Sequence, residues 1–504
     1  MGGPVSSTEP IDQDRAPYAD AMRAYGEGPW IRVHVPGHMG DPKRHPLLAE
    51  WFGDRVLELD VPPLIEGVDI TPDPTPITQA QALAAHAWGA ARTWFLTNGG
   101  SQANHLAVMC ARQLGETLVV QRSVHSSVVD ALVLAGLHSA FVHPSVDDHL
   151  GIAHGVTAAD LSAALDANPD AAAAHLITPS YFGSVSDVAA LAEVAHDHGV
   201  PLIVDEAWGA HFGFHPALPA NALSKGADLV CSSTHKLGGS LTQSAMLHLG
   251  AGPFAKQLEP MVVRGLHTVQ STSTSGILLA SLDLARRQLA TGQAGIGESV
   301  VVADEIRARI RARGRFRIAS DDFLEFPDVV AVDPLRVAID TSAGGISGVR
   351  ASKLLINEHK IHVEVATGAA IVMVIGAGSA PDVDRIVDAL HALPEEGDST
   401  GAEHTALKVP PPGESRMTVR QAFFSPVEVV GVEAAVGRVS ADTLAAYPPG
   451  IPNVLPGEVI TAELVDFFRG TTAHGGYVRG AVDRAVTGFR VVSDQHSDQI
   501  WKES

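Results

Sequence analysis

The alternation of strand-like and helical patterns is the feature that most constrains the fold of this chain. Between residues 76 and 287, short apolar runs such as "TLVVQ" and "PLIVDEAWGAH" alternate with helical stretches such as "AQALAAHAWGA" and "LAEVAHDHG". Strand, turn and helix at this rhythm predict a mostly parallel sheet with helices on both faces. Ligands of such sheets bind at the carboxyl ends of the strands, so functional residues are expected there.

The length and composition predict several domains. The chain has 504 residues, of which 45% are hydrophobic and 18% charged, enough to bury more than one core. A polar, Pro/Gly-rich stretch after residue 394 indicates a linker. We therefore expect an N-terminal segment at 1–75, a large domain at 76–298, a small α/β domain at 299–394, a linker at 395–415 and a C-terminal domain at 416–504.

Charge and hydropathy exclude several classes of partner. A formal net charge of -22 would repel nucleic-acid phosphates. The longest uncharged apolar runs, such as "GAAIVMVIGAG", are shorter than the roughly 18 to 20 residues that span a bilayer. The N-terminus lacks the pattern of a secretory signal, and two cysteines, Cys110 and Cys231, suit a reducing compartment. We expect a cytoplasmic protein without nucleic-acid or membrane partners.

Three polar elements follow predicted strands and together indicate a cofactor. Lys236 ends "GADLVCSSTHK", Asp205 follows the strand "LIV", and "TNGGSQANH" places small residues at the start of a helix. Pyridoxal phosphate (PLP) needs a lysine amine, a carboxylate facing its pyridine nitrogen and donors for its phosphate. The expected phosphate-binding residues are Gly100, Ser101, Gln102 and Ser233. Each element alone is more often a surface lysine, a helix cap or a plain turn, but the three in this order predict a PLP site.

Seven motifs also carry a family resemblance. "PGHMG", "TNGGSQANH", "VDEAWGAHFGFH", "SSTHKLGGSLTQSAMLH", "TSTSGILLASLD", "QAFFSP" and "YPPGIPNVLPGE" resemble the Orn/Lys/Arg decarboxylases, in particular their shorter members. The resemblance implies a fold-type-I PLP-dependent α/β large domain followed by smaller α+β domains. It also implies decarboxylation of arginine, lysine or ornithine to carbon dioxide and a polyamine-type amine.

The resemblance assigns roles to individual residues of the predicted site. It implies that Lys236 holds PLP covalently, that Asp205 faces the pyridine nitrogen and that Ala207 packs beneath the ring. His125, in "RSVHSSV", matches a histidine that stacks on the ring, and His235 matches one close to the reacting centre. Trp208 and Gly100 depart from the family pattern, since a histidine is as common at the first position and a serine is expected at the second.

The same resemblance implies a homodimer. "STSTSG" matches a segment that reaches the phosphate of the neighbouring subunit, which would make Thr272 and Ser273 contacts between subunits. "YPPGIPNVLPGE" would bring Glu458 to the mouth of the site, where its carboxylate is expected to bind the distal cation of the substrate.

Three alternatives are less favoured. An aminotransferase would use the same cofactor and clamp the substrate carboxylate with an arginine such as Arg336 or Arg350. A metal hydrolase would use the histidines of "HVPGH" and "HFGFH", but proline and glycine inside both stretches argue against the helices that would align them. A catalytically silent paralogue would not need Lys236 and Asp205. The substrate stays open among arginine, lysine and ornithine, with the short form favouring arginine. The carboxylates that could distinguish them are Glu66, Asp69, Asp73 and Glu458.

Overall fold

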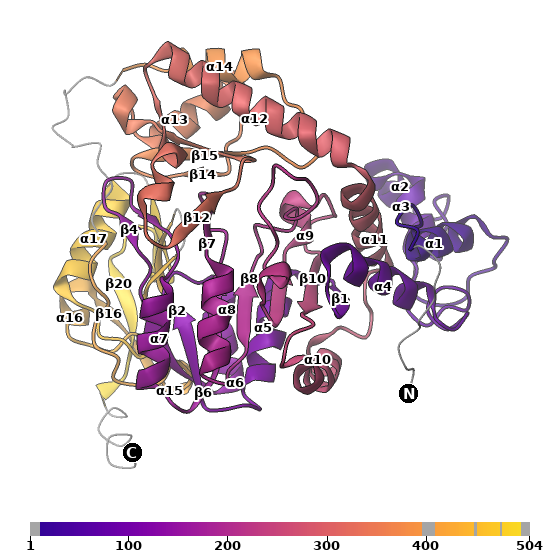
Figure 1. The fold of residues 1–504 in the computed structure, drawn as a ribbon, viewed down its shortest axis with the longest axis horizontal. Helices are drawn as coiled ribbons and strands as arrows, with labels where there is room; N and C mark the ends of the chain where they lie inside the picture. Colours follow the sequence, from indigo (N-terminus) through magenta and orange to yellow (C-terminus); the bar gives the residue numbers. More distant parts are fainter. Residues whose placement is uncertain (1–10, 396–408, 448–450, 474–475, 495–504) are drawn as a thin grey trace.

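A computed structural model describes residues 11–395, 409–447, 451–473 and 476–494. A central α/β domain carries an N-terminal arm on one side, a small domain above it and a C-terminal domain on the opposite side (Figure 1). Most of the linker expected at 395–415 falls on residues 396–408, which lie outside the described residues.

The central sheet has seven strands in the order β1-β10-β9-β8-β6-β2-β3. Neighbouring strands from β9 to β3 run parallel, whereas β10 runs antiparallel to both β1 and β9. The strands are β1 (Arg92–Leu96), β2 (Thr117–Gln121), β3 (His138–Val142), β6 (Ala171–Ile177), β8 (Leu202–Asp205), β9 (Leu229–Ser232) and β10 (Ala245–Leu249). The expected mostly parallel sheet is confirmed.

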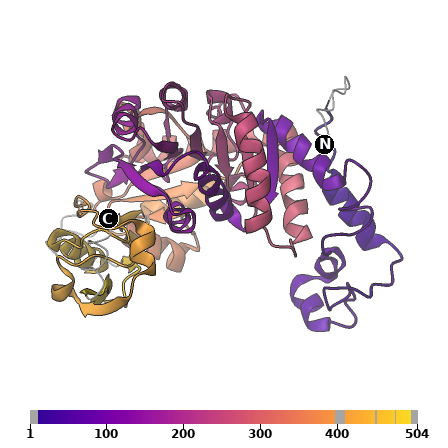
Figure 2. The same cartoon turned by 90° about the horizontal axis from the view of Figure 1, so that it is seen from below.

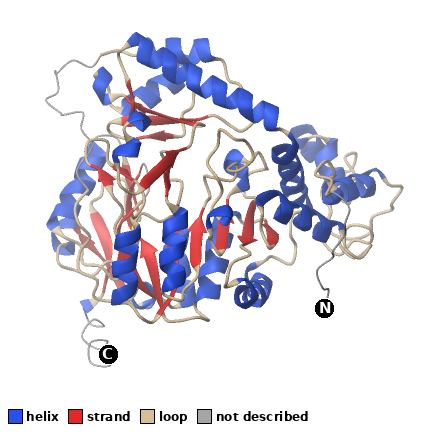
Figure 3. Cartoon of the chain, viewed as in Figure 1, coloured by secondary structure: helices blue, strands red, loops and turns tan. Residues whose placement is uncertain are grey.

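Successive residues of the central strands face two different cores. In β2, Val119 packs into one core, whereas Leu118 and Val120 pack into the other. Helices therefore cover both faces of the sheet (Figure 3). One face carries α4 (Pro76–Trp88), α7 (Ala158–Ala167) and α8 (Val188–Asp197), and the other carries α5 (Gly99–Ala111), α6 (Ser126–Ala135) and α10 (Ala255–Val269).

The small domain is built on a four-stranded sheet of order β11-β13-β15-β14. Its elements are α12 (Gln293–Arg313), β11 (Arg317–Ile318), β13 (Arg336–Asp340), α13 (Gly348–Leu354), β14 (Val365–Ala366), β15 (Ala370–Val374) and α14 (Val383–His391). The boundary expected after residue 298 falls inside α12. The strand-like stretch "DVVAVDPLRVAID" forms two strands, because Pro334 interrupts it and β12 (Val329–Val332) pairs with β7 (Ser184–Ser186) of the large domain.

The C-terminal domain combines short strands and helices around its own core. Its elements are α15 (Val419–Phe424), β16 (Val427–Gly431), α16 (Val432–Ala435), β17 (Leu444–Tyr447), β18 (Pro452–Val454), α17 (Ala462–Ala473), β19 (Tyr477–Arg479) and β20 (Gly488–Val492). Val419 and Leu455 of this domain pack into the core of the large domain. The two domains therefore share buried apolar surface.

The N-terminal arm projects away from the sheet (Figure 2). It contains α1 (Pro17–Glu27), α2 (Pro46–Phe52) and α3 (Asp54–Leu59), and α1 packs against α11 (Gly276–Thr291). Many of its large apolar side chains are exposed, among them Trp30, Ile31, Val33, Val35, Leu47, Trp51, Phe52 and Leu64. No helix in the described ranges combines the length and apolar character needed to cross a membrane.

Candidate active site

The carboxyl ends of four strands bring the predicted residues to one edge of the central sheet. Asp205 is the last residue of β8, and Lys236 lies on the short helix α9 (Thr234–Leu237) directly after β9. His125 lies between β2 and α6, and Gly100 lies in the first turn of α5, just after β1. Parallel strands present these loops on the same side, as the sequence predicts.

Asp205 is a buried carboxylate with hydrogen-bond donors on both oxygens. Its side chain is 2% exposed, Asn104 Nδ2 donates to Oδ2 at 2.8 Å, and the backbone N–H of Ala207 donates to Oδ1 at 3.0 Å. Within the described residues it forms no ion pair with a lysine, arginine or histidine. A buried anion of this kind is costly without a cationic partner, and a protonated pyridine nitrogen would provide one.

Asn104 fixes the orientation of Asp205 and was missed by the sequence analysis. Its amide nitrogen donates to Asp205 and to Ser127 Oγ, and its oxygen faces His175 Nε2 at 3.3 Å. A flipped amide would point oxygen at carboxylate, so only this orientation satisfies all three partners. Burial lowers the pKa of His175 to about 4, which keeps it a neutral donor. The only signal in the sequence for this role of Asn104 was its position three residues after Ser101, on the buried face of a helix.

Lys236 is held as a reactive amine. Burial lowers the pKa of Lys236 to about 8, although the charge of Asp205 opposes this effect and that of Arg336 adds to it. Its Nζ lies 4.0 Å from the centroid of the Trp208 ring. A substantial fraction of the amine is therefore neutral near pH 8, which is the form that attacks an aldehyde. Trp208, noted only as a departure from the family pattern, is a neighbour of the lysine.

Gly100 and Ser233, two of the residues expected to bind the phosphate, lie against one another. A Cβ on Gly100 would overlap Ser233 Oγ, so a larger residue here would require the Ser233 hydroxyl to turn away. Ser101 follows in the first turn of α5, where backbone N–H groups face outward from the helix. Gln102 differs from these three. Its backbone N–H donates to Asn98 O, and its side chain accepts from Asn98 N and donates to Gln270.

The two site histidines are held in opposite tautomers. His125 Nδ1 accepts the backbone N–H of Ser127 at 3.2 Å, so the neutral ring carries its proton on Nε2. His235 Nδ1 lies 2.9 Å from Ser244 O, which only accepts, so its Nε2 is left as an acceptor. Burial lowers the pKa of both rings. His125 is therefore a neutral proton donor, and His235 a neutral proton acceptor, through their Nε2 atoms.

For Thr272, Ser273 and Glu458, contacts within this chain do not by themselves show the expected roles. Thr272 and Ser273 lie in an exposed turn between α10 and α11, as a contact with a second subunit would require, but that contact stays a prediction. Glu458 is 4% exposed and forms an ion pair of 2.8 Å with Arg122. Its charge is thus already paired within the chain, which does not favour the expected role as a binding group for a substrate cation.

The residues that an aminotransferase or a metal hydrolase would need are not arranged for those functions. Arg336 is fully buried, donates to Tyr181 O at 2.7 Å and packs on the ring of Trp208, so its guanidinium is engaged within the chain. The stretches "HVPGH" and "HFGFH" form turns rather than helices. Across the described part of the chain, no three His, Cys, Asp or Glu residues are grouped as metal ligands.

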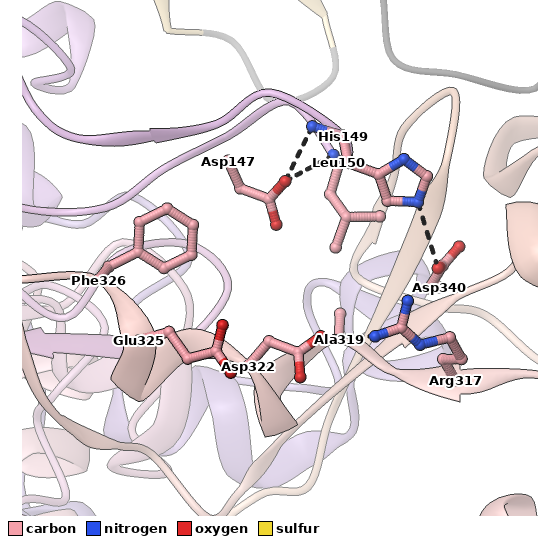
Figure 4. Close-up of a pocket in the computed structure, with 9 residues that line it drawn as sticks. All are labelled: Asp147, His149, Leu150, Arg317, Ala319, Asp322, Glu325, Phe326 and Asp340. Carbon is pink, nitrogen blue, oxygen red and sulfur yellow. Dashed lines mark hydrogen bonds and ion pairs between the residues drawn. The ribbon is translucent and has the colours of Figure 1, made fainter.

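A cavity of about 320 Å³ lies apart from these residues, between the β4–β5 segment (Val146–Asp147 and Ile152–Ala153) and the small domain (Figure 4). It is lined by Asp147, His149, Leu150, Arg317, Ala319, Asp322, Glu325, Phe326 and Asp340. Arg317 pairs with Asp322 at 2.6 Å, and His149 lies 3.6 Å from Asp340. None of the predicted site residues lines this cavity.

Comparison with known proteins identifies the family. Residues 16–381 match the family described as "Orn/Lys/Arg decarboxylase, major domain", and residues 408–494 match its C-terminal domain. The chain belongs to the Orn/Lys/Arg decarboxylase family. An arginine decarboxylase of Bacillus subtilis is 34% identical, covering 97% of this chain and all of that protein. An arginine decarboxylase of Halalkalibacterium halodurans is 35% identical, with 96% and 99% of the two chains covered.

Solved structures agree with this family fold. The lysine decarboxylase of Francisella novicida superposes with a TM-score of 0.79 at 19% identity, covering 95% of this chain and 81% of that one. The constitutive lysine decarboxylase of Escherichia coli gives a TM-score of 0.77 at 20% identity, covering 95% and 82%. Membership of the Orn/Lys/Arg decarboxylases makes the chain a PLP-dependent amino-acid decarboxylase of fold type I that acts on a basic amino acid. The buried Asp205, the start of α5 at Gly100 with Ser233 beside it, and the amine of Lys236 fit that cofactor.

Proposed function

We propose that this chain is an arginine decarboxylase and that Lys236, Asp205 and the loop of His125 form its active site. The observation that carries the placement of the site is the buried carboxylate of Asp205, held by Asn104 and left without a cationic partner within the described residues, next to an amine with a lowered pKa. Arginine is favoured because curated relatives with that activity match almost the whole chain at 34% and 35% identity.

Each residue then has a distinct task. Bound PLP supplies an electron sink for the pair released at the α-carbon when carbon dioxide leaves. Lys236 supplies the amine for covalent attachment, and the charge of Asp205 keeps the ring nitrogen protonated. Gly100, Ser101 and Ser233 would bind the phosphate, and Ala207 would pack against the ring. The N–H of His125 Nε2 supplies a proton donor, whereas His235 Nε2 is an acceptor.

The purified protein loaded with PLP is expected to prefer arginine, with kcat/KM at least about tenfold higher than for lysine or ornithine. The reason is that a planar guanidinium and a compact ammonium need differently placed acceptors. Carbon dioxide release and mass spectrometry of the amine product would measure this. A preference for lysine or ornithine would contradict the substrate assignment, and formation of a keto acid without carbon dioxide would support the aminotransferase alternative.

We also propose that the active unit is a homodimer. Helices α1 and α3 of the arm pack against α11, which begins just after the turn of Thr272 and Ser273, and many large apolar side chains of the arm are exposed. Exposed apolar side chains gathered in one part of the chain are typical of an interface. A second copy covering the arm would also bring the two hydroxyl residues to the neighbouring site.

Substitution Trp51→Lys is expected to shift the protein from dimer to monomer and to reduce its activity at least about tenfold. Trp51 is 80% exposed, so the folded monomer should tolerate the change. Leu324→Lys, at another side chain with 61% exposure, is the matched control and should leave mass and activity unchanged. Sedimentation equilibrium would measure the mass, and a fully active monomer would contradict the proposal.

The cytoplasm is the compartment we infer. Cys110 and Cys231 are both free and buried, which suits a reducing environment.

A further inference from the structure

The C-terminal domain forms hydrogen bonds and an ion pair with the segment that carries His125. The loop in this segment consists of residues 122–125, between β2 and α6. At its start, Arg122 Nη2 donates to Glu458 Oε2 at 2.8 Å and to Asn453 O at 3.1 Å. Just after its end, Ser126 Oγ accepts from Arg479 Nη1 at 3.0 Å. The C-terminal domain therefore contacts the large domain on both sides of His125.

Both partners of the Arg122–Glu458 ion pair are buried, and each is held by further contacts. The two side chains are 8% and 5% exposed. Glu458 Oε2 also accepts the backbone N–H of Leu455 at 2.8 Å, and Leu455 itself is buried in the core of the large domain. The guanidinium of Arg122 packs on Phe141, with Cζ 4.9 Å from the ring centroid. A pair fixed in this way transmits the position of the C-terminal domain to the start of the loop.

Hydrogen bonds next to the loop link His125 to Asp205, the carboxylate expected to face the cofactor ring. His125 Nδ1 bonds to the backbone N–H and Oγ of Ser127, and Ser127 Oγ accepts from Asn104, which also holds Asp205. Displacing the loop would therefore disturb both His125 and the network around Asp205. Removing one partner of this buried ion pair would leave the other charge uncompensated, so a change at Glu458 should disturb Arg122 and the loop that begins with it.

We propose that Glu458 is a positioning residue, which acts through Arg122 to hold the His125 loop in the geometry that binds PLP, and that it does not bind the distal cation of the substrate. The inference rests on the proposed function for its activity readout, since it concerns the same site. It differs from the role expected from the sequence, in which Glu458 contacts the substrate directly.

The test compares Glu458→Gln with the wild-type holoenzyme. We expect PLP to bind at least about tenfold more weakly, the visible circular dichroism of bound PLP to change, and backbone amides of residues 122–130 to exchange faster with deuterium. At saturating PLP, kcat should fall while KM for arginine changes less than about twofold. The double variant Glu458→Gln/Arg122→Met should lose less than the two single variants combined, because no unpaired charge remains.

Glu433→Gln is the matched control, because Glu433 pairs with Arg469 at 2.9 Å on the exposed surface of the same domain. It should behave as the wild type in every measurement. If Glu458→Gln does not fold, Arg122→Lys retains the charge without the forked geometry and should show the same changes to a smaller degree. Unchanged PLP affinity, spectrum and amide exchange, together with a KM for arginine raised tenfold or more, would overturn the proposal and assign Glu458 to the substrate. A wild-type protein without decarboxylase activity would contradict the proposed function, while amide exchange would still test the positioning role.

Discussion

Substitution Lys236→Ala is expected to lower kcat/KM by roughly 10⁴-fold or more, the size of effect seen when a residue of covalent catalysis is removed. The charges of Lys236 and Asp205 interact, and the lowered pKa of Lys236 leaves a substantial fraction of its amine neutral and nucleophilic near pH 8. The activity would be measured as carbon dioxide release, with the folded state checked by far-UV circular dichroism.

Lys225→Ala is the matched control for this change. Lys225 lies on the large domain in the short 3₁₀ helix Leu223–Lys225, so the same atoms are removed from the same domain away from the site. Its activity should equal that of the wild type. A Lys236→Ala protein that keeps more than about a tenth of the activity would show that another residue holds the cofactor.

Substitution Asp205→Asn is expected to lower kcat/KM by roughly 10²-fold or more, equivalent to about 3 kcal/mol. The new side chain has the same shape but no charge to keep the ring nitrogen protonated. In the wild type, one carboxylate oxygen of Asp205 accepts from Asn104 Nδ2 and the other from the N–H of Ala207. The amide nitrogen of the new asparagine would therefore have to face one of these two donors. Binding of PLP should weaken for the same reasons. Titration with PLP and steady-state kinetics would measure both effects.

Asp197→Asn makes the same change at an exposed position of α8 and should have no effect on either quantity. If Asp205→Asn bound PLP and reacted like the wild type, the carboxylate would not be the partner of the cofactor ring.

Sequence patterns were sufficient for the features that depend on neighbouring residues. The period of apolar residues indicated β2, β6, β8 and β9 and the helices between them, because a buried parallel strand must be apolar over its whole length. Topology then placed Asp205 and Lys236 at the same edge of the sheet without any knowledge of side-chain positions. The position of Gly100 against Ser233 also followed from the placement of their two strands.

Contacts between distant residues were not predictable in the same way. The pairs Arg122–Glu458 and Ser126–Arg479 join residues more than 300 positions apart, and no local pattern distinguishes either arginine from a surface cation. The orientation of Asn104 depends on three partners from α6, β6 and β8. Likewise, the split of "DVVAVDPLRVAID" into two strands depends on pairing with β7, which lies far away in the sequence.

The central claim is that PLP is attached to Lys236 in the site at the carboxyl edge of the sheet. The most direct test is to reduce the PLP-loaded protein with borohydride, digest it and locate the pyridoxyl group by peptide mass spectrometry. The account predicts a single modified residue, Lys236, in the peptide that contains "SSTHKLGG". Modification at Lys225 or Lys256 instead, or no modification of a protein that has bound PLP, would contradict it.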